Sequence, residues 1–351
     1  MSDMVLMKGN EAVAEAAIKS GCRYYFGYPI TPQTEIAEYM AKRMPQVNGL
    51  CLQAESEIAA INMVLGASAT GARVLTSSSS PGISLKGEGI SYIVGSDLPC
   101  VIVNMQRGGP GLGGIQPAQS DYYQATKALG HGDIRLIVLA PNSVQEITEL
   151  TSLAFDLADL YRTPVMLLAD GALGQMMEPV DFDKVQIHES PEKTWTAAGH
   201  QNKRKPNIIN SLYLEPAELE ETVIERYKRY DIISAKEVRY EEIGAEDSDI
   251  VAVSYGITSR IAKTAIDMCR KNGIKAGYFR PVTLNPFPSK RLGEIADKTK
   301  RFFVTELNMG QMVDDVKLAA ECKKPVDFYG RNGGIIPTPE EIYEAIVKVL
   351  R

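Results

Sequence analysis

Hydrophobic and polar positions divide the first half of the chain into short apolar runs and helical segments. Before residue 180, the apolar runs typical of buried strands are 22–29, 50–54, 72–78, 98–105, 135–140 and 163–170. Between them, segments such as 31–44 and 143–161 repeat apolar residues at intervals of three and four, which predicts helices. Asn142 and Ser143 are candidate caps of the second helix, and Glu146 supports them. Strands that alternate with helices predict a parallel sheet covered on both faces.

The pattern changes between about residues 181 and 247. Residues 188–207 contain no Val, Ile, Leu, Met or Phe and include the basic run 203–205. This composition predicts a linker or arm whose charges lie in solvent. Residues 216–236 then predict one amphipathic helix, which fastens one domain to the other or to a partner.

A second alternating block begins at residue 249. Its strand-like runs are 249–256, 274–281, 301–308 and 326–330, and helical patterns follow each of them. The sequence therefore predicts an α/β fold with two doubly wound, mostly parallel sheets. We expect domains at residues 1–180 and 248–351, with the linker and its helix at 181–247.

Composition and charge narrow the class of protein. The 351 residues are 44% hydrophobic and 23% charged, as in a soluble globular protein with about two domains. The net charge of -6 argues against general nucleic-acid binding. The longest charge-free stretch, 58–72, is shorter than the roughly 20 apolar residues of a membrane span. The N-terminus does not resemble a signal peptide, so we expect a cytoplasmic protein without a membrane segment.

The sequence lacks the common catalytic and metal-binding motifs. The five cysteines include no CxxC pair, so we expect reduced thiols, with no iron–sulfur cluster or structural zinc in this chain. The three histidines are scattered, which argues against a histidine metal site or a catalytic triad, and no P-loop occurs. A GxGxxG pattern at Gly109, Gly111 and Gly114 follows the fourth predicted strand. A dinucleotide-binding loop should instead follow the first strand.

Polar residues at the ends of the predicted strands are the candidates for ligand binding. Arg107 opens a loop in which five of the eight residues 107–114 are glycine. Open α/β sheets bind ligands at such strand ends, so we interpret Arg107 as a contact for a carboxylate or phosphate. Thr31 stands between prolines before a helix, where it can cap the helix, contact a ligand, or do both. Glu55 and Glu57 follow another strand, and periodicity alone does not decide whether either is a cap or a functional acid.

These motifs occur together in an order that resembles a known family. YPITP (28–32), Ser-Glu (56–57) before a helix of small residues, TSSSSPG (76–82) and RGGPG (107–111) are similar to the α subunits of thiamin-diphosphate-dependent 2-oxoacid:ferredoxin oxidoreductases. RPVTLNPFP (280–288) and ELNMGQM (306–312) resemble the second domain of those subunits, so the resemblance covers nearly the whole chain. It implies a pyrimidine-type cofactor-binding domain followed by a smaller domain like the C-terminal domain of transketolase.

The resemblance also implies roles for particular residues. Glu57 matches the glutamate that hydrogen-bonds the aminopyrimidine ring of the cofactor and stabilises its imino tautomer, and Glu55 is its rival. The YPITP motif implies that Pro29 and Ile30 lie at the cofactor.

Thr31 and Arg107 match the threonine and arginine that bind the 2-oxoacid, and Gly108 stands beside Arg107. The loop 107–125 is most similar to the branched-chain, 2-oxoisovalerate enzyme, because 2-oxoglutarate subunits more often have Ser and then Thr after RGGP. The implied activity is coenzyme A-dependent oxidative decarboxylation of 2-oxoisovalerate to the acyl-CoA, with ferredoxin as the electron acceptor. The alternatives are a 2-oxoglutarate, indolepyruvate, pyruvate or broad-range subunit, and a non-catalytic nucleotide-binding α/β scaffold.

What the chain lacks also agrees with the family. The GDG…N signature that holds magnesium and the cofactor's diphosphate is absent. The resemblance therefore implies a β subunit that supplies the diphosphate site, Mg²⁺ and an iron–sulfur cluster. A γ subunit and a ferredoxin-like δ subunit would complete the assembly.

Overall fold

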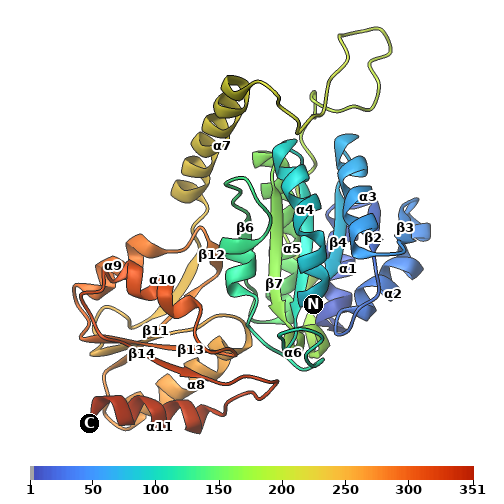
Figure 1. Cartoon of the computed structure of the whole chain (residues 1–351). Coiled ribbons are helices and arrows are strands. Elements are labelled where there is room, and N and C mark those ends of the chain that lie inside the picture. The colour runs from blue at the N-terminus through green and yellow to red at the C-terminus, as the bar shows by residue number, and fades with distance from the viewer. Residues whose placement is uncertain (1–3) are drawn as a thin grey trace.

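The computed structural model describes residues 4–351, and its larger sheet is built mainly from the first half of the chain (Figure 1). This sheet has seven strands in the order β12-β6-β7-β5-β4-β2-β3. The strands from the first half are parallel, and β12 joins β6 antiparallel. Their bounds are β2 (Tyr24–Gly27), β3 (Leu50–Gln53), β4 (Val74–Ser78), β5 (Cys100–Gln106), β6 (Ile137–Leu139), β7 (Pro164–Asp170) and β12 (Thr283–Asn285).

Helices cover both faces of this sheet, as the alternating pattern predicts. One buried cluster joins the sheet to α1, α2 and α5, and another joins it to α3 and α4. A short antiparallel pair, β1 (Val5–Lys8) with β8 (Met177–Val180), lies apart from the main sheet. The helices are α1 (Gly9–Lys19), α2 (Thr34–Arg43), α3 (Glu57–Ala69), α4 (Ser80–Gly95), α5 (Val144–Tyr161) and α6 (Gly171–Gln175).

The second half forms a five-stranded sheet in the order β14-β13-β10-β11-β9, with only β9 antiparallel. Its strands are β9 (Tyr240–Ile243), β10 (Ile250–Val253), β11 (Ala276–Pro281), β13 (Arg301–Glu306) and β14 (Val326–Gly330). Its helices are α8 (Gly256–Lys271), α9 (Ser289–Ala296), α10 (Met312–Ala319) and α11 (Pro339–Leu350). Among the described helices, none combines the length and the apolar composition needed to cross a bilayer.

A long segment connects the two sheets and projects from the molecule in Figure 1. Residues 185–215 contain no helix or strand, and the basic run 203–205 is exposed, as expected. The helix α7 (Pro216–Lys236) follows the predicted bounds and packs on the first half through Arg226, which pairs with Asp97 at 3.3 Å. Tyr230 adds a hydrogen bond, since its hydroxyl accepts from the N–H of Arg135 at 3.1 Å.

The α/β fold with two mostly parallel sheets is confirmed, and four short strands, β1, β8, β9 and β12, lie where the pattern did not predict them. β9 lies inside the expected linker and pairs with β11, while β12 comes from the second half and extends the first sheet. Both are three or four residues long and have too few alternating apolar positions to stand out in the sequence. The division at 1–180, 181–247 and 248–351 stays a prediction.

Candidate active site

Arg107 and Thr31, which are far apart in the sequence, meet beyond the carboxyl ends of β5 and β2, the two strands that flank β4 in the sheet. Arg107 follows β5, is 8% exposed, and donates from Nη1 to the carbonyl of Thr31 at 2.9 Å and from Nη2 to the carbonyl of Leu112 at 3.1 Å. Its Nε is buried and has no hydrogen-bond partner, and no carboxylate in residues 4–351 forms an ion pair with the guanidinium. A buried cation without a counter-ion is costly, so this geometry suits an anionic ligand.

A buried network that sequence reasoning missed fixes the backbone of Arg107. The Ser80 hydroxyl accepts from the N–H of Arg107 at 3.0 Å and donates to Asp121 at 2.6 Å. Asn104 also donates to Asp121, at 3.0 Å. Burial raises the pKa of Asp121, while the hydrogen bonds from Ser80 and Asn104 oppose the rise. The only sequence signal for this network is the position of Ser80 and Asp121 inside the motifs around residues 76–82 and 107–125.

Gly108 has both of its main-chain groups engaged within the loop. Its N–H donates to the carbonyl of Gln116 at 3.0 Å, and its carbonyl accepts from the N–H of Gly114 at 2.9 Å. A side chain at Gly113, where φ is +54°, would put Cβ 1.9 Å from that same carbonyl. These contacts shape the loop so that Arg107 points toward Thr31.

Glu57 and Glu55 lie in different environments, although they are two residues apart. Glu57 is the first residue of α3 and is 6% exposed, whereas Glu55 is exposed. Ser56 caps the helix by accepting from the N–H of Ala59 at 3.2 Å, so the glutamates are not needed as the cap. The carboxylate of Glu57 makes no hydrogen bond or ion pair with any described residue. Burial and a free carboxylate favour Glu57 over Glu55 as a functional acid.

The first turn of α4 connects the surroundings of Glu57 with those of Arg107. A Cβ placed on Gly82 would lie 2.6 Å from Oε1 of Glu57 and 2.1 Å from Oγ of Ser78. The hydroxyls of Ser78 and Ser79 are buried and have no partner among the described residues. No hydrogen bond joins Glu57 to Arg107, so the two are linked only through this turn, in which Ser80 holds Arg107. Pro29 is exposed and Ile30 is half-buried in the loop after β2.

The glycine loop is the loop after β5 that begins with the glycine-rich residues 107–114. Residues from the second half of the chain bind its C-terminal end at Gln119. Gln119 is fully buried and donates from Nε2 to the carbonyl of Tyr255 at 2.8 Å, while its Oε1 accepts from the N–H of Leu307 at 3.0 Å. The main-chain carbonyl of Gln119 accepts from Asn308 at 2.6 Å. The loop that positions Arg107 is therefore fixed by both sheets. Sequence reasoning missed Gln119, because nothing local marks its contacts with residues more than 130 positions away.

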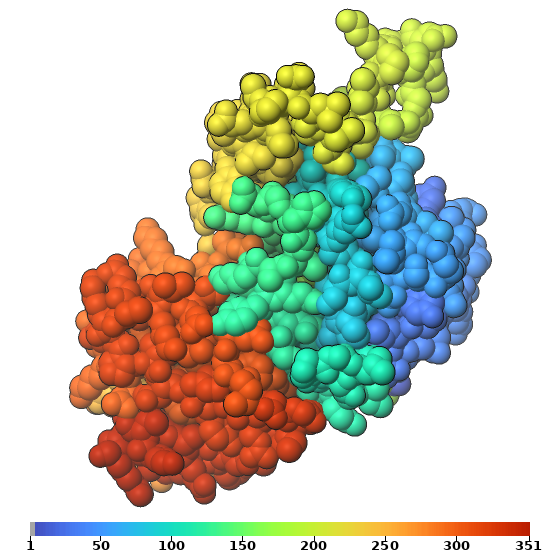
Figure 2. All heavy atoms as spheres, in the orientation of Figure 1, coloured from blue at the N-terminus to red at the C-terminus, as the bar shows by residue number. Residues whose placement is uncertain are grey.

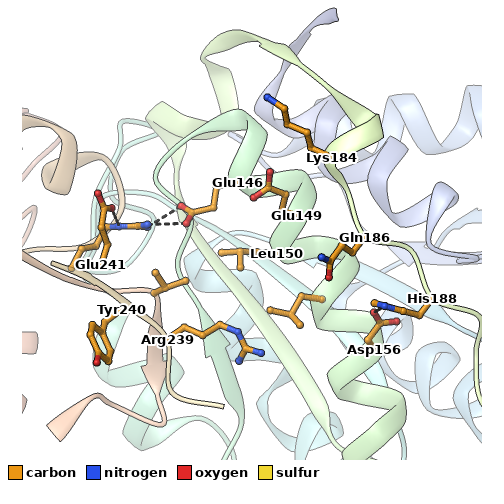
Figure 3. Close-up of a pocket in the computed structure, with 13 residues that line it drawn as sticks. Glu146, Glu149, Leu150, Asp156, Lys184, Gln186, His188, Arg239, Tyr240 and Glu241 are labelled. Atoms are coloured by element: carbon orange, nitrogen blue, oxygen red, sulfur yellow. Dashed lines mark hydrogen bonds and ion pairs between the residues drawn. The ribbon is translucent and has the colours of Figure 1, made fainter. Parts of the chain in front are cut away.

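A cavity of about 610 Å³ lies elsewhere, between α5 and the strands β9 and β11 (Figure 3). None of the predicted site residues lines it. Arg280 contacts both oxygens of Glu146 at 2.8 Å and pairs with Glu241 at 3.0 Å. His188 likewise contacts Asp156 at 2.7 Å. The charges of Arg280, Glu146 and Glu241 are satisfied by each other, so we interpret the cavity as a junction between the two halves.

Large apolar side chains are exposed on the elements that carry the candidate site residues. They are Tyr28, Ile58, Leu85, Leu112 and Ile115, with Leu112 86% exposed. They belong to the loop after β2, to α3, to α4 and to the glycine loop, and the blue-green segment after β5 protrudes beside the C-terminal half in Figure 2. An apolar surface next to a buried acid and a buried arginine is typical of a site that another chain covers.

The residues present fit one half of a thiamin diphosphate site. The unpartnered carboxylate of Glu57, the two orphaned serine hydroxyls and the close approach at Gly82 form a polar cradle for a heterocyclic ring. For the diphosphate, the described residues contain no cluster of His, Cys, Asp or Glu arranged to hold a metal ion. All five cysteines are free.

Comparison with known proteins identifies the class. Residues 15–243 match the domain described as "Pyruvate flavodoxin/ferredoxin oxidoreductase, thiamine diP-bdg", and residues 248–342 match "Pyruvate:ferredoxin oxidoreductase core domain II". The fold is thus that of the thiamin-diphosphate-binding oxidoreductases of this class. The chain belongs to the 2-oxoacid:ferredoxin oxidoreductase family, which confirms the family predicted from the motifs.

Relatives of known name match over whole chains. Ketoisovalerate oxidoreductase subunit VorB of Methanothermobacter marburgensis is 48% identical over 98% of this chain and 97% of its own length. The 2-oxoglutarate synthase subunit KorA of Methanothermobacter thermautotrophicus is 37% identical over 100% of both chains.

Solved structures agree with the fold. A 2-oxoglutarate:ferredoxin oxidoreductase from Magnetococcus marinus, with 2-oxoglutarate, coenzyme A and succinyl-CoA bound, superposes with a TM-score of 0.89 at 28% identity. That match covers 100% of this chain and 66% of the other. A split-gene transketolase, described as an inactive β4 tetramer, shares the fold with a TM-score of 0.62 at 16% identity, over 98% of both chains.

Proposed function

We propose that this chain is the α subunit of a branched-chain 2-oxoacid:ferredoxin oxidoreductase and contributes half of a thiamin diphosphate site. The reaction is the coenzyme A-dependent oxidative decarboxylation of 2-oxoisovalerate to its acyl-CoA, with electrons passing to ferredoxin. The buried and unpaired guanidinium of Arg107 is the observation that carries this proposal, because it provides a dry site for the carboxylate of an oxoacid.

Arg107 and Thr31 act on the substrate. Two of the five N–H groups of the guanidinium are bound to the carbonyls of Thr31 and Leu112. The remaining N–H groups are available for the substrate carboxylate. The Thr31 hydroxyl donates to an oxygen of the oxoacid, and Gly108 keeps the loop in the shape that presents Arg107.

Glu57 acts on the cofactor. When bound, thiamin diphosphate supplies an electron sink for decarboxylation. Glu57 holds a proton shared with a pyrimidine nitrogen, at a carboxylate that is buried and free of other partners. We assign Pro29 and Ile30, in the loop after β2, to the surroundings of the same ring.

The diphosphate half of the site belongs to partner subunits. We assign the diphosphate site, Mg²⁺ and an iron–sulfur cluster to a β subunit, and we expect γ and ferredoxin-like δ subunits in the complex. The exposed apolar side chains around Glu57 and Arg107 support this division, since a second chain would bury them. We expect the assembly to be cytoplasmic.

The preference for a branched-chain substrate rests on the glycine loop and on the relatives. Residues 111–119 include Leu112 and Ile115 and no basic residue, which suits an apolar substrate better than the second carboxylate of 2-oxoglutarate. The VorB relatives are named for ketoisovalerate and share 48% and 47% identity with this chain. The relatives named as 2-oxoglutarate synthase subunits are 35–37% identical to this chain, and 2-oxoglutarate is therefore the alternative substrate.

An assay of the reconstituted complex tests the proposal. The complex is given coenzyme A, a low-potential dye and each of several 2-oxoacids, and dye reduction is followed. We expect 2-oxoisovalerate to be the preferred substrate. A complex that uses 2-oxoglutarate at least tenfold more efficiently would overturn the substrate while leaving the reaction class intact. A complex inactive with every 2-oxoacid would overturn both.

A further inference from the structure

Lys86, on α4, is a fully buried amine to which the proposed function gives no role. Its Nζ donates to Oγ1 of Thr76 at 2.5 Å and to the carbonyl of Ser77 at 3.2 Å, both on β4. Oγ1 of Thr76 in turn donates to the carbonyl of Phe26 on β2 at 2.7 Å. Since the one hydroxyl proton of Thr76 is used there, the bond between Lys86 and Thr76 must use an N–H of the lysine.

The hydrogen-bond acceptors around Nζ suffice for a neutral amine and leave one N–H of an ammonium ion without a partner among the described residues. An ammonium group has three N–H donors, and a neutral amine has two. Only two acceptors lie within hydrogen-bond distance of Nζ among the described residues. Burial lowers the pKa of Lys86 to about 7, and the negative charge of Glu57 is the largest influence that opposes this fall. Lys86 therefore gains and loses its proton near neutral pH.

Among the groups that shift the pKa of Lys86, Glu57 is the one carboxylate. The groups facing Lys86 from β4 are a hydroxyl and a carbonyl, and the thiol of Cys100 faces it from β5. Burial raises the pKa of Cys100 to about 12, so this thiol stays neutral while Lys86 titrates. Glu57, on α3, is the other side chain that raises the pKa of Lys86, and of these two side chains it is the one that carries a charge.

Packing places Glu57 against the face of α4 that carries Lys86. Gly82 and Lys86 are four residues apart on α4 and so share one face of the helix. A Cβ on Gly82 would lie 2.6 Å from Oε1 and 3.1 Å from Cγ of Glu57. The glycine thus lets the carboxylate reach this face, where the hydroxyl of Ser78 lies 2.1 Å from the same Cβ position and has no partner among the described residues.

We propose that Lys86 is the counter-charge of Glu57 and a positioning residue for the pyrimidine ring of the cofactor, an inference that rests on the proposed role of Glu57. When Nζ is protonated, its positive charge balances the buried carboxylate of Glu57 once the pyrimidine ring excludes water from that carboxylate. After Nζ releases its proton to solvent, the carboxylate stays buried without a counter-charge, which is costly. Cofactor binding is therefore coupled to the charge on Lys86.

The pairing can be tested on the cofactor-free chain. Lysine labelled with ¹³C at Cε is followed by NMR from pH 5 to 11 in the wild type, in Glu57→Gln and in Glu55→Gln, and Lys86→Met identifies the signal. Loss of the nearby anion should lower the midpoint of the Lys86 titration by about one pH unit in Glu57→Gln. Glu55→Gln should leave it unchanged, since Glu55 is exposed. An unchanged midpoint in Glu57→Gln would overturn the pairing.

Binding of thiamin diphosphate by the reconstituted complex tests the consequence. In the wild type we expect affinity to fall about tenfold from pH 6 to pH 9, whereas Lys86→Met should bind weakly and lose this dependence. Lys42→Met, at an exposed position of α2, is the matched control and should behave as the wild type. A Lys86→Met complex with the wild-type pH dependence would overturn the proposal.

The two proposals fail in different ways. If Glu57→Gln leaves thiamin diphosphate affinity unchanged, the proposed role of Glu57 is wrong, whatever the NMR titration gives. If Glu57→Gln weakens binding but Lys86→Met keeps the wild-type pH dependence, only the role of Lys86 is wrong. If Lys86→Met does not fold, as checked by circular dichroism, Lys86→Arg identifies the signal instead, and the titration of Glu57→Gln against the wild type decides.

Discussion

At the scale of single residues, burial separates groups that the sequence leaves equivalent. Glu55 and Glu57 both follow β3, but only Glu57 is buried, and Ser56 caps α3. Arg107 is likewise an arginine at a strand end in the sequence, and the structure adds that its guanidinium has no ion-pair partner among residues 4–351. Neither feature follows from periodicity, because both depend on which side chains converge from other elements.

Glu57→Gln should lower turnover of the reconstituted complex by about 100-fold or more, because an amide cannot hold the proton that a carboxyl group shares with the cofactor. Glu55→Gln should have a mild effect. Initial rates measure both variants, and circular dichroism checks that they are folded. If Glu55→Gln lost turnover and Glu57→Gln kept the wild-type rate, the roles of the two glutamates would be assigned the wrong way round.

Substitutions of Arg107 should distinguish the contribution of its positive charge to substrate binding from that of its planar, forked shape. Arg107→Lys keeps the charge but loses the planar fork, so the KM for the oxoacid should rise more than kcat falls. Arg107→Ala leaves the substrate carboxylate unpaired and should cost about 2–5 kcal/mol in kcat/KM. Steady-state kinetics over a range of oxoacid concentrations measure both. Equal kcat/KM for the wild type and Arg107→Ala would exclude Arg107 from the substrate site.

At the scale of elements, the first turn of α4 requires a glycine beside Glu57. Gly82→Ala would place a methyl group 2.6 Å from Oε1 of Glu57 and 2.1 Å from Oγ of Ser78. Overpacking of this kind should cost about 1–3 kcal/mol in the free energy of unfolding and displace the carboxylate, so thiamin diphosphate should bind more weakly.

Gly66→Ala on α3 is the control for this substitution. A Cβ at Gly66 would meet nothing within 4 Å, so alanine in the helix interior should raise stability by roughly 0.5–1 kcal/mol. Denaturant unfolding and calorimetric titration with thiamin diphosphate measure both variants. Tight cofactor binding by Gly82→Ala would contradict the packing argument.

The sequence predicted the elements with strong periodicity and missed those that depend on distant contacts. α5 begins after Ser143 and α7 spans 216–236, as their patterns and caps predict. β9 and β12 were missed because each is short and is stabilised by pairing with a strand from another segment. The same reason applies to Gln119 and Asp121, whose partners lie in other elements. Glu57, Thr31 and Arg107 were predicted from motifs and from their places at strand ends rather than from periodicity, and their roles stay predictions.

At the scale of the whole molecule, Asp170 connects the two halves. Its Oδ1 accepts from the N–H of Leu173 at 3.1 Å, and its Oδ2 accepts from the N–H of Ile257 in α8 at 2.9 Å. Burial raises the pKa of Asp170 to about 6. An unfolded aspartate titrates near pH 4, so between about pH 4 and 6 the folded chain binds a proton that the unfolded chain lacks. The stability contributed by Asp170 is therefore complete below about pH 4 and is lost as the pH rises through 6.

Asp170→Asn should remove this dependence. The difference in unfolding free energy between the wild type and Asp170→Asn should fall by about 3 kcal/mol from pH 4 to pH 7. Urea unfolding at a series of pH values measures it. A difference that stays constant, or that grows with pH, would contradict the assignment of a raised pKa to Asp170.

The account rests on this chain providing the pyrimidine half of a shared cofactor site. A structure of the reconstituted complex with thiamin diphosphate bound tests that claim most directly. We predict that a pyrimidine nitrogen lies about 2.6–3.2 Å from the carboxylate of Glu57, with the diphosphate held by the partner subunit. A pyrimidine ring bound to Glu55, or one held away from this chain altogether, would contradict it.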